Sequence, residues 1–318
     1  MTLIGLFHPL ADAIKGFMKE DFIPARANKV MHTLAPALSI VPAFTAFAVI
    51  PFGDVMTLGG RTINLVVADL NVGILFAFAI MSLATYGVVL AGWSSYNNYS
   101  LLGALRASAQ MLSYEIVMGL TVVGVFMVYG SIQLTEIARA QGEMLTLAGV
   151  NTWIPKWGIV TQPVAFFLFL AAAIAETKRA PFDLPEAESE LVAGYFLEYS
   201  GMKFLMFWMG EFVEMVVISG LVATLFLGGW QIPWLMRDGF HVPFTTILIA
   251  LPPLAISLAG ILSFWTKVII LLWLQMTIRW TLPRFRYDQI MRLGWKMLLP
   301  LSLANIVVTG IVILVLNG

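Results

Sequence analysis

The sequence has no cysteine and little charge, since only 11% of its 318 residues are Asp, Glu, Lys or Arg. Iron–sulfur clusters are held mainly by cysteine thiolates, so this chain cannot carry an ordinary one, and it cannot form a disulfide. It contains neither a G-x-G-x-x-G nor a Walker A sequence, and its three histidines (His8, His32 and His241) are scattered. Any electron carrier or nucleotide that its function needs must therefore be bound by another polypeptide.

Apolar residues, by contrast, make up 60% of the chain. A soluble domain has about 45–50% apolar and about 25% charged residues, and a bilayer core requires runs of roughly 20 apolar residues. Such runs recur along the whole sequence. They predict an all-α, polytopic integral membrane protein that forms a single membrane domain over residues 1–318.

About seven apolar stretches are long enough to cross a membrane. We expect transmembrane helices within Leu34–Phe52, Val66–Leu90, Met111–Tyr129, Gly158–Ala175, Phe204–Leu227, part of Phe244–Ile278, and Met297–Leu316. The sixth block is too long for one simple crossing and is interrupted by Pro252, Pro253 and Gly260. One helix that ends near Ile278, preceded by a re-entrant or interfacial stretch, is the simplest prediction for it.

The positions of the 18 Lys and Arg residues favour a single crossing in that block. With seven crossings, most of these bases lie on one side, at the start of the chain and in loops near residues 91–110, 178–203 and 279–296. Loops on the cytoplasmic side carry such an excess of Lys and Arg. The sequence therefore predicts that these loops, including the acidic loop 178–203, are cytoplasmic.

Residues 1–30 are predicted to form an amphipathic helix at the membrane interface. Apolar residues recur at helical spacing, charged residues share another side, and Pro24 ends the pattern. The apolar positions are Leu3, Phe7, Leu10, Ile14 and Phe17, and the charged ones are Asp12, Lys15 and Lys19. Because the stripe is too interrupted to span a bilayer, the helix lies in the cytoplasmic interface or packs on a soluble partner, and a position between the two satisfies both.

Three carboxylates, Glu115, Glu211 and Glu214, fall well inside the predicted spans, and Glu176 closes the fourth span. Asp69 also falls within the second span, but it lies near the end of that span, where an interfacial position accounts for it. An ionisable side chain at membrane depth costs roughly 2.5–3.5 kcal/mol on insertion scales, so it marks a functional site by default. Structural roles remain open, because Glu176 could pair with Arg179 or lie in headgroup water, and Glu115 and Glu214 could hydrogen-bond neighbouring helices. Glu211 and Glu214 are three residues apart on one helix face, where two like charges cannot both ionise cheaply. We expect this pair to take up and release protons.

The charge of the chain is concentrated in ETKRAPFDLPEAESE, which runs from Glu176 to Glu190. The two prolines make APFDLP stiff and non-helical, so that Arg179, Phe182 and Asp183 are held in fixed directions. A charge run is usually a solvated loop. Apolar residues are interleaved through this one, however, and they favour an acidic pocket that protein covers at the cytoplasmic edge of the membrane.

The acids at the end of this segment have a helical spacing. If a helix starts at Pro185, Glu186 and Glu190 lie one turn apart on one face and Glu188 lies on another. Glu198 follows two turns after Glu190. These acids could therefore pass protons towards the carboxylates within the spans.

The stretch ETKRAPFDLPEAESELVAGYFLEYSGMKF resembles the signature of the quinone-chamber subunit of respiratory complex I, the H subunit of bacterial proton-pumping NADH:quinone oxidoreductase. The stretches LADAIKGFMKED, GWSSYNNYSLLGALRASAQMLSYE, FLGGWQIP and LPRFRYDQIMRLGWK also resemble that family, and the resemblance covers nearly the whole chain. It implies a multi-pass protein of the bacterial inner (plasma) membrane with quinone as substrate. It also implies that FMN and iron–sulfur clusters reside on partner subunits, among them the peripheral redox arm, and that antiporter-like membrane subunits are neighbours.

The resemblance implies a role for each position that matches a family motif. The positions of the quinone chamber are Arg179, Phe182, Asp183 and Glu186, with Asp12 and Lys15 by the quinone entrance. Glu188, Glu190 and Glu198 fall in an acidic funnel, and Glu115, Glu176 and Glu211 lie on an intramembrane proton relay. Glu214 matches no family position, so its assignment to the relay rests on the helix-face argument alone.

Two features depart from the family pattern. Another transmembrane helix and a GPNR-like loop normally come first, so we expect that the sequence is truncated, that its start was chosen too late, or that another polypeptide supplies the helix. In AIMSLATYG some relatives place an acid at or near Ser82, which predicts a shorter or differently routed relay here.

Two alternatives stand beside the complex I subunit. The homologous membrane subunit of an energy-converting hydrogenase or formate hydrogenlyase needs no quinone, but the uninterrupted ETKRAPFDLPEAE and EYSGMKF favour complex I. A stand-alone ion-coupled secondary transporter could use the buried acids as an ion site. Such transporters often contain internal repeats, and the sequence has no second copy of the acidic loop.

Overall fold

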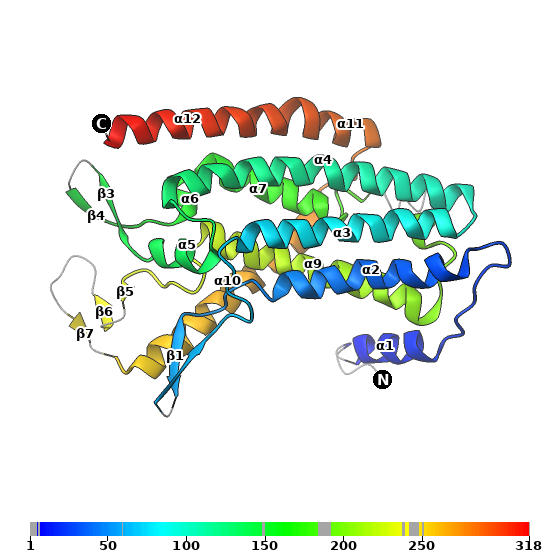
Figure 1. Cartoon of the computed structure of the whole chain (residues 1–318), viewed down its shortest axis with the longest axis horizontal. Coiled ribbons are helices and arrows are strands. Elements are labelled where there is room, and N and C mark those ends of the chain that lie inside the picture. Colours follow the sequence, from blue (N-terminus) through cyan, green and yellow to red (C-terminus); the bar gives the residue numbers. More distant parts are fainter. Residues whose placement is uncertain are drawn as a thin grey trace.

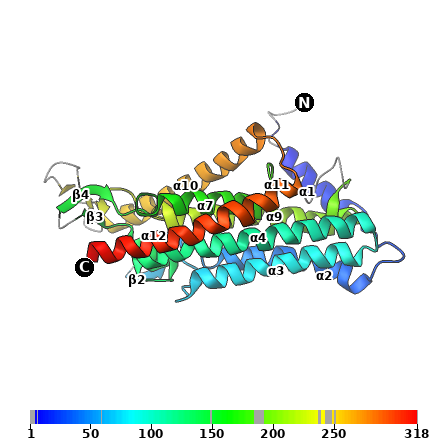
Figure 2. The ribbon, with the colours of Figure 1, turned by 90° about the horizontal axis from the view of Figure 1, so that it is seen from above.

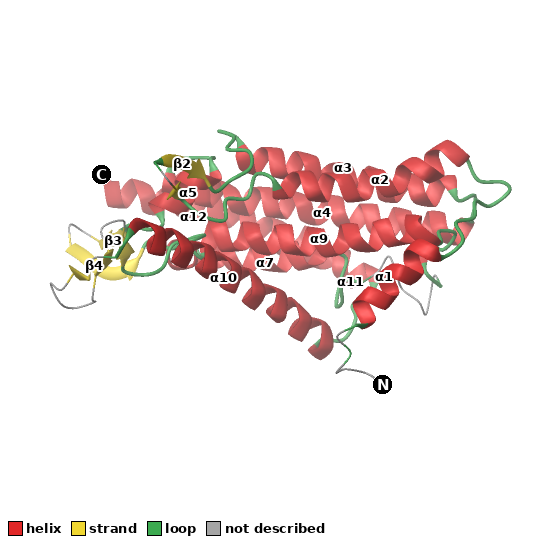
Figure 3. Ribbon diagram, turned by 90° about the horizontal axis from the view of Figure 1, so that it is seen from below, coloured by secondary structure: helices red, strands yellow, loops and turns green. Residues whose placement is uncertain are grey.

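The computed structural model describes residue 5 and residues 7–58, 60–147, 150–183, 192–236, 239–241, 248–249 and 251–317. Within these residues, six helices are long and apolar enough to cross a membrane, and α7 is a shorter apolar helix. The long helices lie roughly side by side, except that α10 diverges from the rest (Figure 1, Figure 3). The predicted polytopic all-α membrane fold is confirmed.

The elements follow one another as bundle helices separated by short strands and helices. The helices are α1 (His8–Met18), α2 (Lys29–Phe47), α3 (Gly73–Ser94), α4 (Asn98–Tyr129), α5 (Leu134–Ala140), α6 (Gly158–Thr161), α7 (Pro163–Glu176), the 3₁₀ turn η1 (Gly194–Phe196), α9 (Gly201–Phe226), α10 (Pro253–Thr281), α11 (Tyr287–Arg292), the π-helical turn η2 (Leu293–Leu298) and α12 (Leu299–Asn317). The strands are β1 (Val55–Leu58), β2 (Arg61–Asn64), β3 (Met144–Leu147), β4 (Val150–Pro155), β5 (Leu235–Met236), β6 (Gly239–His241) and β7 (Leu248–Ile249).

The two ends of the bundle differ in the connections that they carry. Antiparallel strands β1–β2, β3–β4 and β5–β6–β7 gather at one end, which we call the hairpin end (Figure 1). Helix α1 and the connections at residues 95–97, 177–183, 192–200 and 282–286 lie towards the other end, which we call the loop end. This alternation follows because each long helix crosses the bundle and returns the chain to the opposite end.

Helix α9 is the most buried of the six long helices, whereas α10 and the helix that continues from α11 into α12 are the least buried. Helix α2 packs on α3 and α9, and α4 packs on α3, α7 and α12. Gly87 allows the close contact of α3 with α2, because a Cβ there would lie 3.0 Å from the Ala35 carbonyl oxygen. Figure 2 shows α12 lying along α4 on the outside of the bundle.

Two predicted boundaries are wrong. The stretch 91–110 was expected to be a loop, but α3 continues to Ser94 and α4 begins at Asn98, where the Asn97 side chain accepts a hydrogen bond from the backbone N–H of Tyr99. A capping Asn and small residues that pack on other segments extend α4 beyond its apolar run. The expected loop 279–296 is likewise mostly helical, in the end of α10, α11 and η2.

The other spans agree with the expected positions more closely. One helix, α10, fills the sixth block as predicted, but Pro252 and Pro253 begin it and Gly260 lies within it against Trp230. Proline is tolerated in the first turn of a helix, so this pair starts α10 and does not break it. Short strands precede it, where a re-entrant or interfacial stretch was expected, and residues 242–247 and 250 are outside the described part of the chain.

Lys267 joins α10 to the end of α9. Its Nζ donates hydrogen bonds to the backbone carbonyls of Leu227, Gly229 and Gln231, at 2.8, 2.9 and 2.6 Å. The ammonium also lies 4.7 Å from the centre of the Trp157 ring. Leu227 is the C-cap of α9, and Gly229 and Gln231 lie in the segment that follows, so Lys267 supplies a donor to the carbonyls of the turn that ends this helix.

Candidate functional site

Helix α7 ends at Glu176, and the residues that follow it turn into the interior of the protein. Lys178 has a φ of 54°, in the left-handed region that residues other than glycine rarely adopt. Its side chain and that of Arg179 are buried. The turn therefore brings two cations inside the protein, where a charge requires a partner.

Gln110 of α4 fixes both sides of this turn. Its Nε2 donates to the carbonyl of Ala175 at 2.7 Å and to that of Phe182 at 2.8 Å. The Phe182 ring is buried between the rings of Tyr114 and Phe285, with centroids 5.8 and 5.5 Å away. Two hydrogen bonds and two ring contacts therefore hold the APFD segment in place.

Asp183 links the same segment to the chain after α10. Its Oδ2 lies 2.6 Å from Nη2 of Arg284, and the two side chains are 19% and 35% exposed. The pair is thus at the edge of the protein and partly accessible to solvent. The next eight residues, which include Glu186, Glu188 and Glu190, lie outside the described part of the chain.

Glu211 of α9 is the partner of the two buried cations. Its Oε2 lies 3.2 Å from Nη2 of Arg179, and its Oε1 lies 3.8 Å from Nζ of Lys178. Tyr195 donates its hydroxyl to Oε1 at 2.8 Å. The two pairs lie at ion-pair distance, and the tyrosine supplies the short hydrogen bond. One buried carboxylate thus has two cations and one hydroxyl donor as partners.

Two further acids lie deeper in the bundle. Glu176 at the end of α7 and Glu214, one turn after Glu211 on α9, are buried, and one carboxyl oxygen of each has no hydrogen-bond donor among the described residues. Glu214 interacts electrostatically with Lys178, Glu211 and Arg179, and Glu176 with Glu214. Both residues of the Glu211–Glu214 face therefore point inward, and three carboxyl groups share one region.

Glu115 of α4 completes the set of acids within the spans. It is half-buried, interacts electrostatically with Glu176 and Glu214, and has the Ser82 hydroxyl beside its carboxyl group. Ser82 is the position at which an acid was expected from some relatives. A hydroxyl there lies beside the Glu115 carboxyl group, but it carries no charge of its own.

Glu198 lies apart from these acids. It accepts a hydrogen bond from Nδ2 of Asn97 at 2.7 Å, beside the Tyr199 ring that stacks on His32 at 4.0 Å. Burial raises the pKa of Tyr199 to about 12, whereas its hydroxyl neighbours oppose the shift, so the phenol stays protonated at neutral pH. The structure describes no contact between Glu198 and the acids of the spans.

Asp12 and Lys15 line a separate cavity of about 360 Å³ between α1 and the start of α9, which we call the α1 cavity. Gly201 allows α1 to approach, since a Cβ there would lie 2.8 Å from the Lys19 carbonyl oxygen. The apolar stripe of α1 faces outward, with Leu10, Ile14 and Phe17 more than half exposed. That exposure agrees with a helix that rests on lipid or on a partner.

Two aromatic side chains lie between the α1 cavity and the buried charged residues Lys178, Arg179 and Glu211. Trp208 lines the cavity, and its ring contacts the Phe212 ring edge-on at 5.1 Å. The Arg179 guanidinium lies over the other ring of this pair, 4.7 Å from its centre. A cation this close to an aromatic face is attracted to it, so Arg179 contacts both the aromatic pair and Glu211.

Several of these residues were not expected from the sequence as site residues: Lys178, Tyr195, Gln110, Trp208, Phe212 and Arg284. Lys178 lies inside the ETKRAPFD segment, and its position directly before Arg179 could have marked it as a site residue. Gln110 and Tyr195 could not be found from spacing, because their partners are more than ten residues away along the chain. No group of three or more metal-ligating side chains is found in the described ranges.

A family model and the similar known proteins all indicate the same family. A family model described as NADH dehydrogenase matches residues 1–310. The H subunit of NADH-quinone oxidoreductase from Thermomicrobium roseum is 49% identical over 97% of this chain and 83% of its own length. An H subunit of the same enzyme from Cytophaga hutchinsonii is 43% identical over 98% and 84%, and one from Geobacter metallireducens is 49% identical over 96% and 82%. These matches do not support the hydrogenase-type subunit or the stand-alone transporter, and the chain belongs to the NADH dehydrogenase family that includes the H subunits of NADH-quinone oxidoreductase.

Proposed function

We propose that the chain is the membrane subunit of a proton-translocating NADH:quinone oxidoreductase in which quinone reduction is coupled to proton movement. The observation that supports this most directly is the position of Arg179. Its guanidinium contacts Phe212, one ring away from the α1 cavity, and Glu211, which lies one turn from the buried Glu214. Arg179 thus contacts an aromatic ring next to the cavity in which a quinone can bind, and it also contacts one of the acids through which protons can move.

The chamber side consists of Arg179, Phe182, Asp183 and Glu186, with Asp12 and Lys15 at its entrance. A quinone has an apolar tail and a headgroup with two carbonyl oxygens. The α1 cavity offers charged groups together with Phe204, Leu205 and Trp208, which suits such a molecule. Because the chain has no cysteine, the electrons come from partner subunits, and we assign the FMN and iron–sulfur clusters to them.

The relay side consists of Glu115, Glu176, Glu211 and Glu214, fed by Glu188, Glu190 and Glu198. Reducing a quinone to a quinol consumes protons as well as electrons, so the charge near Arg179 changes during turnover. A change in the pairing of Arg179 with Glu211 alters the field at Glu214 and Glu176, because the electrostatic interactions join all of them. Proton uptake and release by the buried carboxyls would then follow the redox state of the quinone.

Residues 1–318 form, in this proposal, a single multi-pass domain of the bacterial inner membrane. Its loop end, with the acidic loop 178–203, faces the cytoplasm, since most of the Lys and Arg residues lie there. The peripheral redox arm covers that end. Antiporter-like membrane subunits lie beside the chain in the membrane and are coupled to its relay acids.

The proposal is tested with the assembled complex that carries Arg179→Met. We expect reduction of a short-chain quinone by NADH to fall about tenfold or more, the size of a lost charged contact. Electron transfer to a soluble acceptor that bypasses the quinone should be unchanged. Arg179→Lys, which keeps the charge, should retain part of the activity, and Glu136→Gln, an exposed acid on α5, should behave as wild type. Full quinone reduction and proton pumping by an assembled Arg179→Met complex would overturn the proposal, as would ion transport by the purified chain alone.

A further inference from the structure

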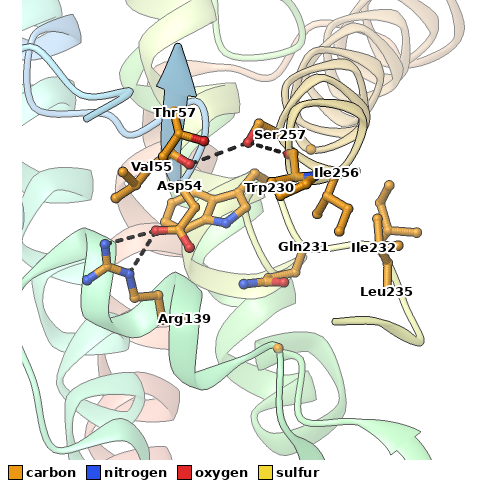
Figure 4. A pocket seen from close by; sticks show the side chains of 13 residues that line it. Asp54, Val55, Thr57, Arg139, Trp230, Gln231, Ile232, Leu235, Ile256 and Ser257 are labelled. Atoms are coloured by element: carbon orange, nitrogen blue, oxygen red, sulfur yellow. Dashed lines mark hydrogen bonds and ion pairs between the residues drawn. The ribbon is translucent and has the colours of Figure 1, made fainter. Parts of the chain in front are cut away.

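The hairpin end contains a second, larger cavity that the proposed function does not use. It has a volume of about 600 Å³ and lies between β1, α5, the segment that follows α9, and the first turns of α10 (Figure 4). We call it the hairpin-end cavity and define it by six of its lining residues: Asp54, Arg139, Trp230, Gln231, Ile256 and Ser257. A volume of this size is in the range of small-molecule sites in proteins, about 300–1,000 Å³.

One wall of the cavity carries an ion pair. Nε and Nη2 of Arg139 donate to the same carboxylate oxygen of Asp54, at 3.1 and 2.9 Å. The two side chains are 44% and 22% exposed, so they remain within reach of a ligand. Among the described residues that line the cavity, these two are charged, and their formal charges cancel. The lining therefore suits a ligand that carries one positive and one negative group and has no net charge.

The opposite walls supply uncharged polar groups. The indole nitrogen of Trp230 is buried, and it donates to no acceptor in the described part of the chain. Figure 4 shows this side chain between Asp54 and the side chains of α10, above Gln231. This nitrogen has almost no accessible surface, so Trp230 lines the cavity with its ring and not with this donor. Ser257 and the Gln231 amide add further hydrogen-bonding groups next to apolar Ile256.

The surroundings are those of a membrane interface. Trp153, Trp157 and Trp234 lie close to this end of the bundle, and Nε1 of Trp234 donates to the Trp153 carbonyl at 3.1 Å. Tryptophan is enriched at the depth of lipid headgroups. On an adjoining face of α10, Leu254, Leu258 and Leu262 are 45%, 52% and 70% exposed. A molecule whose polar end enters the cavity can therefore lay acyl chains against an apolar surface beside it.

From these observations we propose that the hairpin-end cavity binds the headgroup of a zwitterionic phospholipid of the phosphatidylethanolamine type. The phosphate lies on the side of Arg139, and the ammonium lies on the side of Asp54. Ethanolamine fits better than choline, because its N–H groups can donate to the Asp54 carboxylate and to the Gln231 carbonyl oxygen, whereas a quaternary ammonium prefers a cage of aromatic rings. The site is on the opposite end from the α1 cavity and is independent of the proposed function.

The test uses the assembled complex in phosphatidylcholine nanodiscs that contain a photoreactive phosphatidylethanolamine. We expect crosslinks at residues 228–236 and 251–262, which unlabelled phosphatidylethanolamine competes away. Ser257→Phe should reduce this labelling about tenfold, because it fills the cavity without removing the ion pair. Arg139→Gln should also reduce it about tenfold, because it removes one charged hydrogen bond to the phosphate. Arg61→Gln, which changes an exposed arginine on β2 outside the lining, is the matched control for Arg139→Gln and should label as wild type.

Three results would overturn the proposal. The first is equal labelling of wild type, Ser257→Phe and Arg139→Gln in complexes that assemble normally. The second is competition by phosphatidylglycerol or phosphatidylcholine as effective as that by phosphatidylethanolamine, since the cavity would then not select the ethanolamine headgroup. The third is displacement of the probe by glycerophosphoethanolamine or inorganic phosphate at the same concentration as the lipid, because the occupant would then be a soluble phosphate compound.

Discussion

The Nη2 atom of Arg179 lies 3.2 Å from Oε2 of Glu211, and both side chains are more than nine-tenths buried. Lys178 approaches the other oxygen of the same carboxylate. A single acid thus compensates two cations that the turn after α7 places inside the protein. In a low-dielectric environment such a group of charges is stable only as a unit, because removal of one member leaves the others without compensation.

We therefore predict that Glu211→Gln is more harmful than its small change in shape suggests. Breaking a buried ion pair from one side costs about 3–5 kcal/mol. Quinone reduction by the assembled complex should fall at least about tenfold, since 1.4 kcal/mol corresponds to a factor of ten. The measurement is NADH:quinone activity per assembled complex, quantified by native electrophoresis. Adding Lys178→Met, which removes one of the two cations, should restore part of the assembly lost in Glu211→Gln, and wild-type activity of Glu211→Gln would contradict this account.

Glu176→Gln and Glu214→Gln test the relay without changing side-chain volume. Glutamine can hydrogen-bond but cannot release a proton, so each substitution should lower coupled proton pumping strongly, by about a hundredfold if the carboxyl is an obligatory proton carrier. Pumping is measured in proteoliposomes with a pH-sensitive dye, together with NADH oxidation. The matched control is again Glu136→Gln. An unchanged ratio of protons to electrons in both variants would remove these acids from the relay.

The Asp183–Arg284 pair allows a structural role to be separated from a role towards the quinone. Both side chains are partly exposed, so the pair contributes at most about 1 kcal/mol to stability. Asp183→Asn should reduce quinone reduction about tenfold with assembly preserved, if its carboxylate acts on the quinone directly. Arg284→Gln should reduce it only a few-fold, because it removes the partner and not the acid. Equal losses in the two single variants and no further loss in the double variant would assign Asp183 to holding the loop.

Local sequence signals predicted the helices but not the contacts between them. Each of the seven apolar runs overlaps with one of the six long helices or the shorter α7, because a bilayer core requires a run of apolar residues in every helix that crosses it. The start of α4 was missed by thirteen positions, since Asn98–Gln110 is a polar and small-residue stretch whose helical state depends on an Asn97 cap and on packing against η1. Spacing along one helix did predict that Glu211 and Glu214 point the same way, towards the interior.

Contacts across the bundle required the structure. Nothing in the sequence around Lys267 indicates that its ammonium caps the end of α9, because its three acceptors are main-chain carbonyls that any residue provides. The two hydrogen bonds of Gln110 to the turn after α7 are similarly hidden, since both acceptors are backbone atoms. Charged and polar residues inside spans could be recognised as unusual from the sequence, whereas their partners could not be named.

Lys267→Met tests whether the lysine within α10 is a structural cap. The substitution keeps most of the apolar stem but leaves three carbonyls at the end of α9 without their donor, and each buried acceptor that loses its partner costs about 1–3 kcal/mol. The complex should therefore lose its membrane arm at a lower temperature, which is measured by heating the complex and following dissociation by size-exclusion chromatography. Lys156→Met is the control, because Lys156 also lies over an aromatic ring, 5.8 Å from the centre of Tyr129, and a cation–π contact alone contributes only about 0.5–1 kcal/mol at an exposed site. Lys267→Arg, which keeps several donors, should dissociate between the wild type and Lys267→Met. Equal stabilities of Lys267→Met and Lys156→Met would show that the three carbonyl contacts do not hold α9 to α10.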